Sequence, residues 1–161
     1  MFKQLAINLP KKKIKLIAKK HLEIRKNFTW LPKNYNETLS ELKKHFKLVI
    51  VSSGVWPWGN YDFEKIFGFK MKKHFDFIVN SFEYGFLKDS EMLFKIALKK
   101  TGLKKKDVAF VGNSYEDDIL LAKKFGLKTI FLNKNNKNKK GDLTIISLKE
   151  LKEKINVIKK L

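Results

Sequence analysis

Short apolar runs recur along the chain and alternate with stretches in which apolar residues return every three or four positions. The runs are QLAIN (4–8), KLVIVSS (47–53), FDFIVNS (75–81), DVAFVG (107–112), KTIFLN (128–133) and DLTIIS (142–147). Each predicts a buried strand. Strands that are apolar on both faces are typical of a parallel sheet covered by helices on both sides. The pattern therefore predicts an α/β fold.

Three of the intervening stretches predict amphipathic helices, over residues 36–46, 89–101 and 115–125. Asn36 is expected to cap the first helix, and Asp89 or Ser90 the second, because these side chains accept hydrogen bonds from free N–H groups. Gly102 and Gly126 are expected to end the other two. Ligands of such folds bind beyond the carboxyl ends of the strands, so side chains there are the first candidates for chemistry.

The composition adds a strong positive charge. Lysine and arginine total 36 against 16 acidic residues, a formal net charge of +20, and Arg25 is the only arginine. Such a field attracts phosphates and favours a polyanion partner such as RNA. Lysine suits contact with a phosphate backbone, whereas base readout favours the guanidinium. A second explanation stays open, because an AT-rich genome also enriches Lys, Asn, Ile and Phe together.

Several classes of protein are excluded. The chain has no cysteine, which excludes disulfides, thiolate metal sites and cysteine nucleophiles. No run approaches the roughly 20 apolar residues that span a bilayer, and the N-terminus lacks the apolar region of a signal peptide. We therefore expect a cytoplasmic protein with no membrane partner. A length of 161 residues suits one domain, residues 1–161, with its own core.

Polar groups suited to an anion follow two of the predicted strands. KLVIVSSG ends in Ser52, Ser53 and Gly54, whose hydroxyls and backbone N–H groups suit a phosphate oxygen. Lys88 lies just before a predicted helix, where its ammonium can meet the same anion. A further strand ends in VAFVGNSYEDD and opens a helix whose first turn is acidic.

In this order and spacing, the segments resemble the haloacid dehalogenase-like (HAD) phosphohydrolase superfamily, from about Leu31 to Leu151. Ser52 matches the Ser/Thr of the family's second motif and Lys88 the lysine of its third. GNSYEDD is similar to the fourth motif, usually Gly-Asp-Ser-x-x-Asn-Asp, with Asn113 in place of its first Asp and Asp118 matching its last. DLTIISLKELKEKI resembles the closing strand and helix. The resemblance implies a Rossmann-like parallel sheet with helices on both faces.

The family's first motif, Asp-x-Asp-Gly-Thr, follows its N-terminal strand and supplies a nucleophile and an acid/base. Aligned on the strand predicted at 4–8, Asn8 takes the nucleophile position and Pro10 the acid/base position. A neutral amide is a poor nucleophile, and proline carries no proton. The alternative is that the true first strand is absent because the chain is truncated.

The resemblance also implies a weakened metal site. Asn8, Pro10 and Asn113 stand where the family carries carboxylates, which Mg²⁺ prefers as ligands. Asp118, Asn113 and Asp117 then form a vestigial metal site, and Asp117 has a simpler explanation, because an acid in a first helical turn suits the helix dipole. We expect no cofactor in this protein, or Mg²⁺ if the site is active.

Basic and aromatic residues are expected around the same edge of the sheet. They are Lys11, Lys12, Lys134, Lys137, Trp56 and Trp58. Rings beside lysines form a stacking surface for single-stranded nucleic acid, worth about 1–3 kcal/mol per base. The alternative is that the rings pack into the core or a subunit contact. Capped members of the family insert a sizeable helical domain between the first and second motifs, whereas residues 11–46 leave room only for a reduced helical insert. The resemblance therefore implies an open site, which takes a macromolecular ligand or is closed by another subunit of a homo-oligomer.

These features lead to three hypotheses. The first is a catalytically impaired phosphohydrolase relative, a pseudoenzyme, that binds a phosphorylated ligand or RNA. The second is an active phosphatase with an atypical metal site. The third is a structural subunit that uses the Trp-rich loop as its contact.

Overall fold

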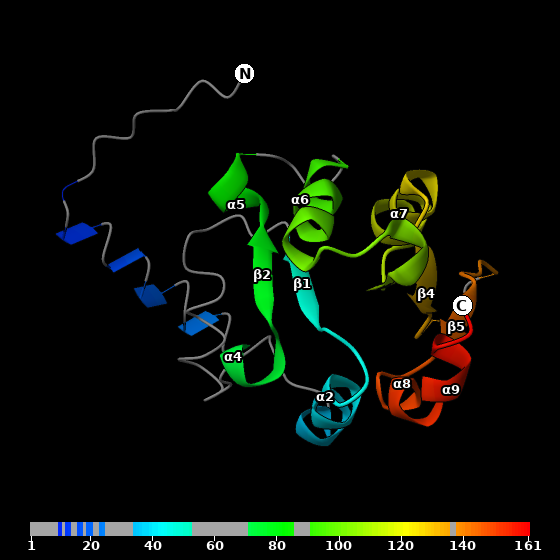
Figure 1. Cartoon of the computed structure of the whole chain (residues 1–161). Helices are drawn as coiled ribbons and strands as arrows, with labels where there is room; N and C mark the ends of the chain where they lie inside the picture. Colours follow the sequence, from blue (N-terminus) through cyan, green and yellow to red (C-terminus); the bar gives the residue numbers. More distant parts are fainter. Residues whose placement is uncertain are drawn as a thin grey trace.

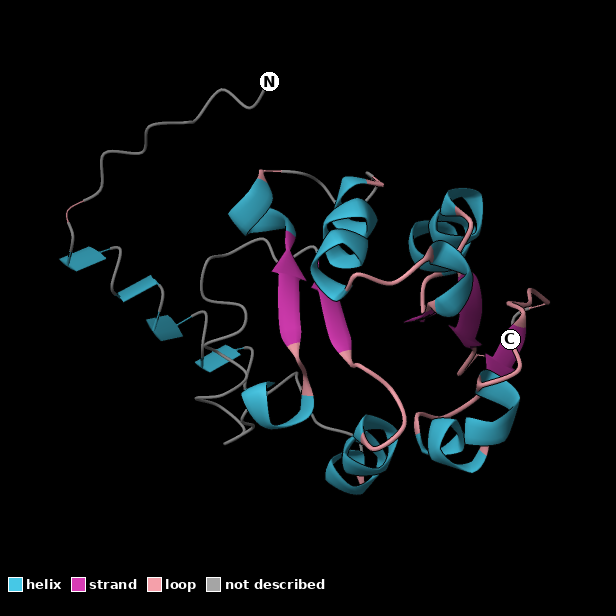
Figure 2. Ribbon diagram, in the orientation of Figure 1, coloured by secondary structure: helices cyan, strands magenta, loops and turns pink. Residues whose placement is uncertain are grey.

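The computed structural model describes residues 10, 12–13, 16–17, 19–20, 23–24, 34–52, 71–85, 91–135 and 138–161. Its strands are β1 (Val49–Ser52), β2 (Phe77–Asn80), β3 (Ala109–Gly112), β4 (Lys128–Leu132) and β5 (Leu143–Ile145). They form two parallel sheets, β1-β2 and β3-β4-β5 (Figure 2). Five of the expected strands are thereby confirmed, and the sixth, at 4–8, lies outside the described residues.

Helices connect these strands. The α-helices are α2 (Tyr35–Lys43), α4 (Met71–His74), α5 (Ser81–Tyr84), α6 (Met92–Thr101), α7 (Leu121–Phe125), α8 (Lys149–Glu153) and α9 (Ile155–Ile158). A 3₁₀ turn, η1 (Lys105–Asp107), precedes β3, and a π-helical turn, η2 (Tyr115–Leu120), precedes α7. Within the described ranges, we find no helix with the length and apolar character that a membrane span requires.

Two helical layers cover opposite faces of the sheets (Figure 1). On one face α6 and α7 pack Phe94 and Phe125 against Phe110 of β3. On the other face α2 and α8 pack Leu42 and Leu151 against the strands, including the neighbouring Ala109. Since successive residues of a strand point to opposite faces, Ala109 and Phe110 belong to different cores. The expected α/β architecture with helices on both faces is confirmed.

The start of α2 corrects one prediction. Asn36 lies inside the helix, which begins at Tyr35. The position before the helix is held by Asn34, in the left-handed conformation with φ 62°, and its side chain makes no capping hydrogen bond. Asn36 therefore cannot cap the helix, because the backbone already turns helical before it. The candidate caps Asp89 and Ser90 lie outside the described residues.

The two predicted helix ends are confirmed. Gly102 and Gly126 both have left-handed backbones, with φ 69° and 89°. The Gly102 N–H donates to the Leu98 carbonyl at 2.9 Å, and the Gly126 N–H donates to the Lys123 carbonyl at 3.0 Å. Glycine adopts this conformation without the steric cost of a Cβ, which explains its use at both positions.

Candidate functional site at the carboxyl ends of the strands

The predicted phosphate site is described at Ser52 alone. Ser52 is the half-buried last residue of β1, in register with Asn80 of β2. Ser53, Gly54 and Lys88 lie outside the described residues, as do Asn8, Lys11, Lys137, Trp56 and Trp58. Pro10, Lys12 and Lys134 are exposed. The structure thus positions one hydroxyl at the expected strand end and leaves the rest of this site as a prediction.

The loop after β3 is fixed by a buried carboxylate. Asp118 is only 3% exposed, and its Oδ2 accepts hydrogen bonds from the N–H groups of Asn113 and Ser114, both at 2.9 Å. Hydrogen bonds to an ionised acceptor are among the stronger ones in proteins. Gly112 is required here, because a Cβ at this position would lie 2.2 Å from the Cβ of Asp118. Asp118, which the sequence placed in a vestigial metal site, therefore braces the loop.

Two hydrogen bonds between Ser114 and Asp117, which the sequence pattern was not used to predict, lie at the start of the following helical turn, η2. The Ser114 hydroxyl donates to Asp117 Oδ2 at 2.8 Å and accepts from the Asp117 N–H at 3.3 Å. The Ser114 hydroxyl accepts from the third residue of the turn as the serine of a capping box does, but the Ser114 N–H donates to Asp118 instead of to Asp117, so only half of a capping box is formed. The spacing Ser-x-x-Asp was the available signal. Asp117 is therefore engaged at the start of η2, in keeping with the simpler explanation for an acid in the first turn.

The described residues do not fit a magnesium ion by themselves. Among the ranges that the structure describes, no three carboxylate or imidazole side chains come together in a way that could hold a metal. Asp118 directs one oxygen at two backbone amides, and Asp117 is bonded to Ser114. Asn113 is exposed and carries a neutral amide. No catalytic step through a metal follows from these side chains.

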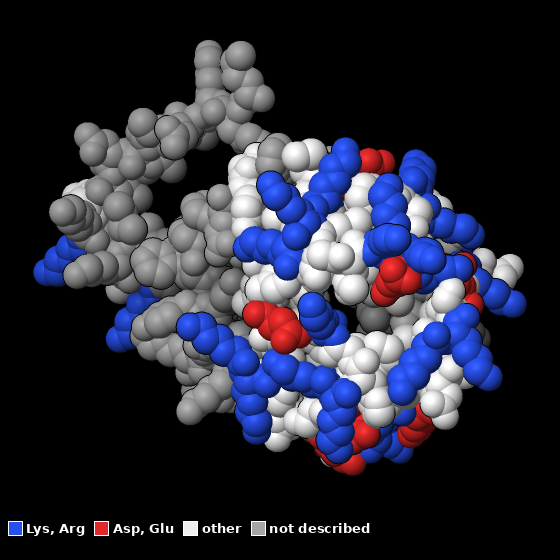
Figure 3. All heavy atoms as spheres, viewed as in Figure 1, with Lys and Arg blue, Asp and Glu red and all other residues white. Residues whose placement is uncertain are grey.

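The lysines near this edge are partly engaged and widely spread. Lys139 pairs with Glu116 of η2 and lies 4.9 Å from the centroid of the Tyr115 ring. Tyr115 in turn contacts Phe131 edge to face, with centroids 5.6 Å apart. Figure 3 shows lysine side chains at many places on the described part of the visible face, with acidic groups between them. Among the described residues on this face, the positive charge is dispersed and forms no single basic track.

Parallel strands covered by helices on both faces, with a serine ending one strand and a braced acidic turn following another, define an α/β protein. Proteins of this class bind their ligands beyond the carboxyl ends of the strands. The description "Haloacid dehalogenase-like hydrolase" belongs to the family model that matches residues 1–132. The chain belongs to this haloacid dehalogenase-like hydrolase family.

Two similar proteins carry the name glyceraldehyde 3-phosphate phosphatase. The protein of Methanothermobacter thermautotrophicus is 33% identical over 132 residues, which cover 74% of this chain and 56% of the relative. The protein of Methanocaldococcus jannaschii is 32% identical over 132 residues, which cover 77% of this chain and 56% of the relative. The chain thus spans little more than half the length of either relative.

Solved structures of the family share the fold. A HAD phosphatase from Thermococcus onnurineus superposes with a TM-score of 0.73 at 23% identity, over 86% of this chain and 64% of that one. A HAD-hydrolase from Bacillus subtilis, bound to magnesium, gives 0.74 at 23% identity, over 88% and 63%. At these identities the likeness concerns the fold.

Proposed function

We propose that this chain binds a small phosphomonoester, of the size of glyceraldehyde 3-phosphate, at the carboxyl ends of β1 and β3. The observation that carries the proposal is the loop from Gly112 to Ser114, which Asp118 braces at the strand end through two hydrogen bonds. Ser52 ends β1 with a hydroxyl suited to a phosphate oxygen. The relatives named as phosphatases of a small phosphorylated sugar support a ligand of this class.

We expect the natural chain to bind this ligand and to hydrolyse it slowly. Asn8, Pro10 and Asn113 stand where the family resemblance implies carboxylates, and none of them can act as a nucleophile or carry a proton. Among described residues, no metal-binding cluster offsets this loss. A second candidate function, phosphatase activity, is favoured by the names of the two relatives.

RNA is the less favoured ligand. A net charge of +20 attracts polyanions. Against it, the lysines on the face shown in Figure 3 are dispersed, and Lys139 is paired with Glu116. Binding that depends on many backbone phosphates weakens linearly in log salt, with a slope of about 0.7 per phosphate on a single strand. A pocket for one phosphomonoester weakens far less.

The test is a calorimetric titration with glyceraldehyde 3-phosphate and with inorganic phosphate. We expect saturation at one ligand per chain, a loss of about tenfold in affinity or more on Ser52→Ala, corresponding to about 1.4 kcal/mol, and no change on Ser40→Ala. Ser40 is an exposed serine on α2 and serves as the matched control. Absence of saturable binding would overturn the proposal, as would a steep salt slope with RNA alone.

Release of phosphate with Mg²⁺ separates the two candidate functions. The natural chain should be nearly silent, and a variant carrying Asn8→Asp, Pro10→Asp and Asn113→Asp should gain activity. Rapid turnover by the natural chain, abolished by Lys88→Ala, would establish the phosphatase instead and would show that the alignment of the first motif is wrong.

A further inference from the structure

Lysines lie at many places on the described surface, but carboxylates neutralise only some of them. Paired lysines lie on or next to α2, α6 and α8 and in the loop after β4. Around α8, for example, the ammonium groups of Lys149, Lys152 and Lys154 lie 3.2, 2.6 and 2.8 Å from glutamate oxygens. The ion pairs are therefore distributed unevenly over the chain.

A group of lysines without such pairs surrounds one edge of the β3-β4-β5 sheet. They come from the last turn of α6, from η1 with the residue before it, and from the last turn of α7, and they are Lys99, Lys100, Lys104, Lys105, Lys106, Lys123 and Lys124. All seven are exposed. In the part of the chain that the structure describes, none of the seven lies within ion-pair distance of a carboxylate. We call these seven residues the lysine surface.

The lysine surface lies opposite the candidate site. η1 directly precedes β3, and the last turn of α7 precedes β4, which is parallel to β3. Both segments therefore lie where these strands begin, whereas the loop braced by Asp118 lies where β3 ends. η1 contacts α7 there, since the Lys105 ammonium lies 3.8 Å from the centroid of the Phe125 ring. α6 lies beside α7, with the Phe94 and Phe125 rings stacked at 5.5 Å, so the three turns are neighbours.

Little in the fold offsets this charge. The three turns contribute one acid, Asp107. Lys100 and Lys105 rest against aromatic rings, which attract an ammonium but do not cancel its charge. A lysine in a last helical turn suits the helix dipole, but like charges on neighbouring turns repel one another. The fold therefore gains little from the seven together, whereas an anionic partner gains from all of them.

The shape and chemistry of the lysine surface distinguish two kinds of polyanion. A nucleic acid backbone is contacted at successive phosphates, and the described lysines on the face in Figure 3 form no continuous track for it. Leu103, between Lys100 and Lys104 in the chain, is 39% exposed. A phosphate backbone offers no apolar side chain to this leucine, whereas an acidic polypeptide offers apolar groups as well as carboxylates. Protein interfaces combine an apolar centre with a polar rim, which favours the polypeptide.

We propose that the lysine surface binds an acidic segment of a partner protein, with Leu103 against an apolar side chain of that segment. Because the surface lies at the edge where β3 and β4 begin, the partner leaves the candidate site at the end of β3 open. Complementary charge speeds the encounter of the two proteins, and added salt weakens it. This binding is independent of whether the chain binds a phosphomonoester.

Fluorescence anisotropy with the full chain tests the proposal, and the probe is a labelled oligoglutamate peptide with one leucine at its centre. A triple glutamine variant of the lysine surface should bind the peptide about tenfold more weakly or worse. Its changes are Lys99→Gln, Lys104→Gln and Lys124→Gln. Glutamine suits a helix nearly as well as lysine, so this variant should fold.

The matched control removes the same net charge from lysines that are already paired. Its changes are Lys149→Gln, Lys152→Gln and Lys154→Gln. It should weaken peptide binding by less than about twofold, because these ammonium groups are neutralised by glutamates in the fold. The difference between the two triple variants therefore measures the place of binding and not the total charge of the chain.

Leu103 separates a polypeptide from a nucleic acid. Leu103→Ser should weaken binding of the leucine-bearing peptide by about threefold or more. It should not change the binding of a peptide with glycine in place of that leucine, nor the binding of a DNA or RNA duplex. Titration with glyceraldehyde 3-phosphate should be the same for the natural chain and for the triple variant of the lysine surface.

Four outcomes would overturn the proposal. Absence of peptide binding, or equal losses in the two triple variants, would mean that the lysine surface is not a docking site. Duplex binding that is tighter than peptide binding and is lost in the triple variant of the lysine surface would assign this surface to a nucleic acid. Weaker binding of glyceraldehyde 3-phosphate by the same variant would assign the lysines to the phosphomonoester site.

Discussion

The two sheets differ in how completely they are built. β3, β4 and β5 form a sheet whose central strand is buried on both faces, with Ile130 and Phe131 each 1% exposed. β1 and β2 form a pair in which full burial is confined to the end of β2, at Val79 and Asn80. Similar apolar sequences thus reach different burial, because burial of a strand depends on what lies beside it as well as on the helices above and below.

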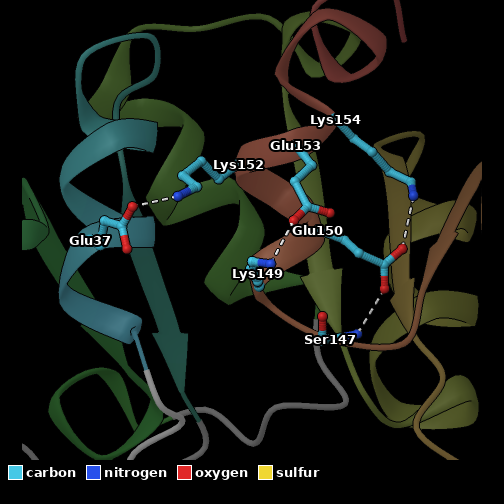
Figure 4. A network of polar contacts seen from close by, with 7 residues as sticks. All are labelled: Glu37, Ser147, Lys149, Glu150, Lys152, Glu153 and Lys154. Carbon is cyan, nitrogen blue, oxygen red and sulfur yellow. Dashed lines mark hydrogen bonds and ion pairs between the residues drawn. The ribbon is translucent and has the colours of Figure 1, made fainter.

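The two sheets are joined on one face by the contact between α2 and α8. Leu42 of α2 packs in one core with Ile130, Ile145 and Leu151, so the helix that leads into β1 rests on the other sheet. The start of α8 is braced by Glu150, which accepts from the N–H groups of Ile146 and Ser147 (Figure 4). The same carboxylate accepts from Lys154, and this hydrogen bond is the main cause of its lowered pKa.

The largest expected difference between the two sheets is in the free energy of unfolding that is lost when one of their isoleucines is replaced by alanine. Ile130→Ala should lower the free energy of unfolding by about 3 to 4 kcal/mol, because it leaves a cavity in a strand buried on both faces. Ile50→Ala in β1 should cost about half as much, because Ile50 is only half-buried. Urea denaturation of the two variants measures both values. Equal losses would show that the β1 sheet is as fully packed as the other.

Much of this architecture follows from the sequence. The apolar runs predict β1 to β5 because burial of both strand faces requires continuous apolar residues, and the glycines at 102 and 126 end their helices for a local steric reason. The separation into two sheets was not predictable from periodicity. Periodicity indicates that a segment is buried, whereas strand pairing depends on contacts between residues far apart in the chain.

The sequence predicted which strand ends the candidate site occupies, but it did not predict the role of each side chain there. The carboxyl ends of β1 and β3 were identified correctly as strand ends. The role of Asp118 was not, because its bonds to the amides of Asn113 and Ser114 depend on the exact path of the loop. The family resemblance named the residue, and only the three-dimensional contacts assign it to bracing the backbone.

A smaller effect is expected at Asp142, which closes the loop between β4 and β5. Its Oδ2 accepts from the Thr129 N–H and hydroxyl at 2.7 and 2.8 Å. Burial acts to raise the pKa of this carboxyl, but the hydrogen bonds from Thr129, with help from Lys123 and Lys128, outweigh it and lower the pKa below the ordinary 3.8. Asp142→Ala should cost about 1 kcal/mol, a low figure because Asp142 is largely exposed and screened by solvent.

The lowered pKa gives this prediction a pH dependence. The contribution of Asp142 is complete above its ordinary pKa and is lost as the pH falls below about 4, when the folded carboxylate takes up its proton. The difference in unfolding free energy between the natural chain and Asp142→Ala should therefore shrink between pH 5 and pH 3. A difference that stays constant over that range would assign the effect to packing.

His74, at the end of α4, should also make a pH-dependent contribution to stability, on the side of the β1-β2 sheet. It is 3% exposed and meets Tyr35 of α2 edge to face, with ring centroids 6.4 Å apart. Burial, with smaller contributions from Lys73 and Lys43, lowers its pKa below the ordinary 6.5. Neutral histidine is therefore favoured in the fold, and its contribution is complete above about pH 7 and lost as the pH falls and the unfolded chain binds a proton.

Replacing the imidazole tests this reading. Between pH 7 and pH 5 the natural chain should lose more stability than His74→Gln, which cannot be protonated in that range. His45→Gln is the control, since His45 lies on the surface next to Glu41. A steeper pH dependence for His74→Gln than for the natural chain would mean that the folded protein favours the charged imidazole.

The smallest effect is expected from the ion pair across the contact of α2 and α8. Lys152 Nζ lies 2.6 Å from Glu37 Oε1, and hydrogen bonding between the two lowers the pKa of Glu37 and raises that of Lys152 (Figure 4). Both groups remain in contact with water, and exposed pairs contribute little to stability. A double-mutant cycle with Glu37→Gln and Lys152→Met should give a coupling near the limit of detection, and added salt should remove it.

Leu42→Ala, in the same contact, should cost several times more and keep its cost in high salt, because burial of apolar surface holds the helices together. A coupling that equals the effect of Leu42→Ala would mean that charge holds the two sheets in place.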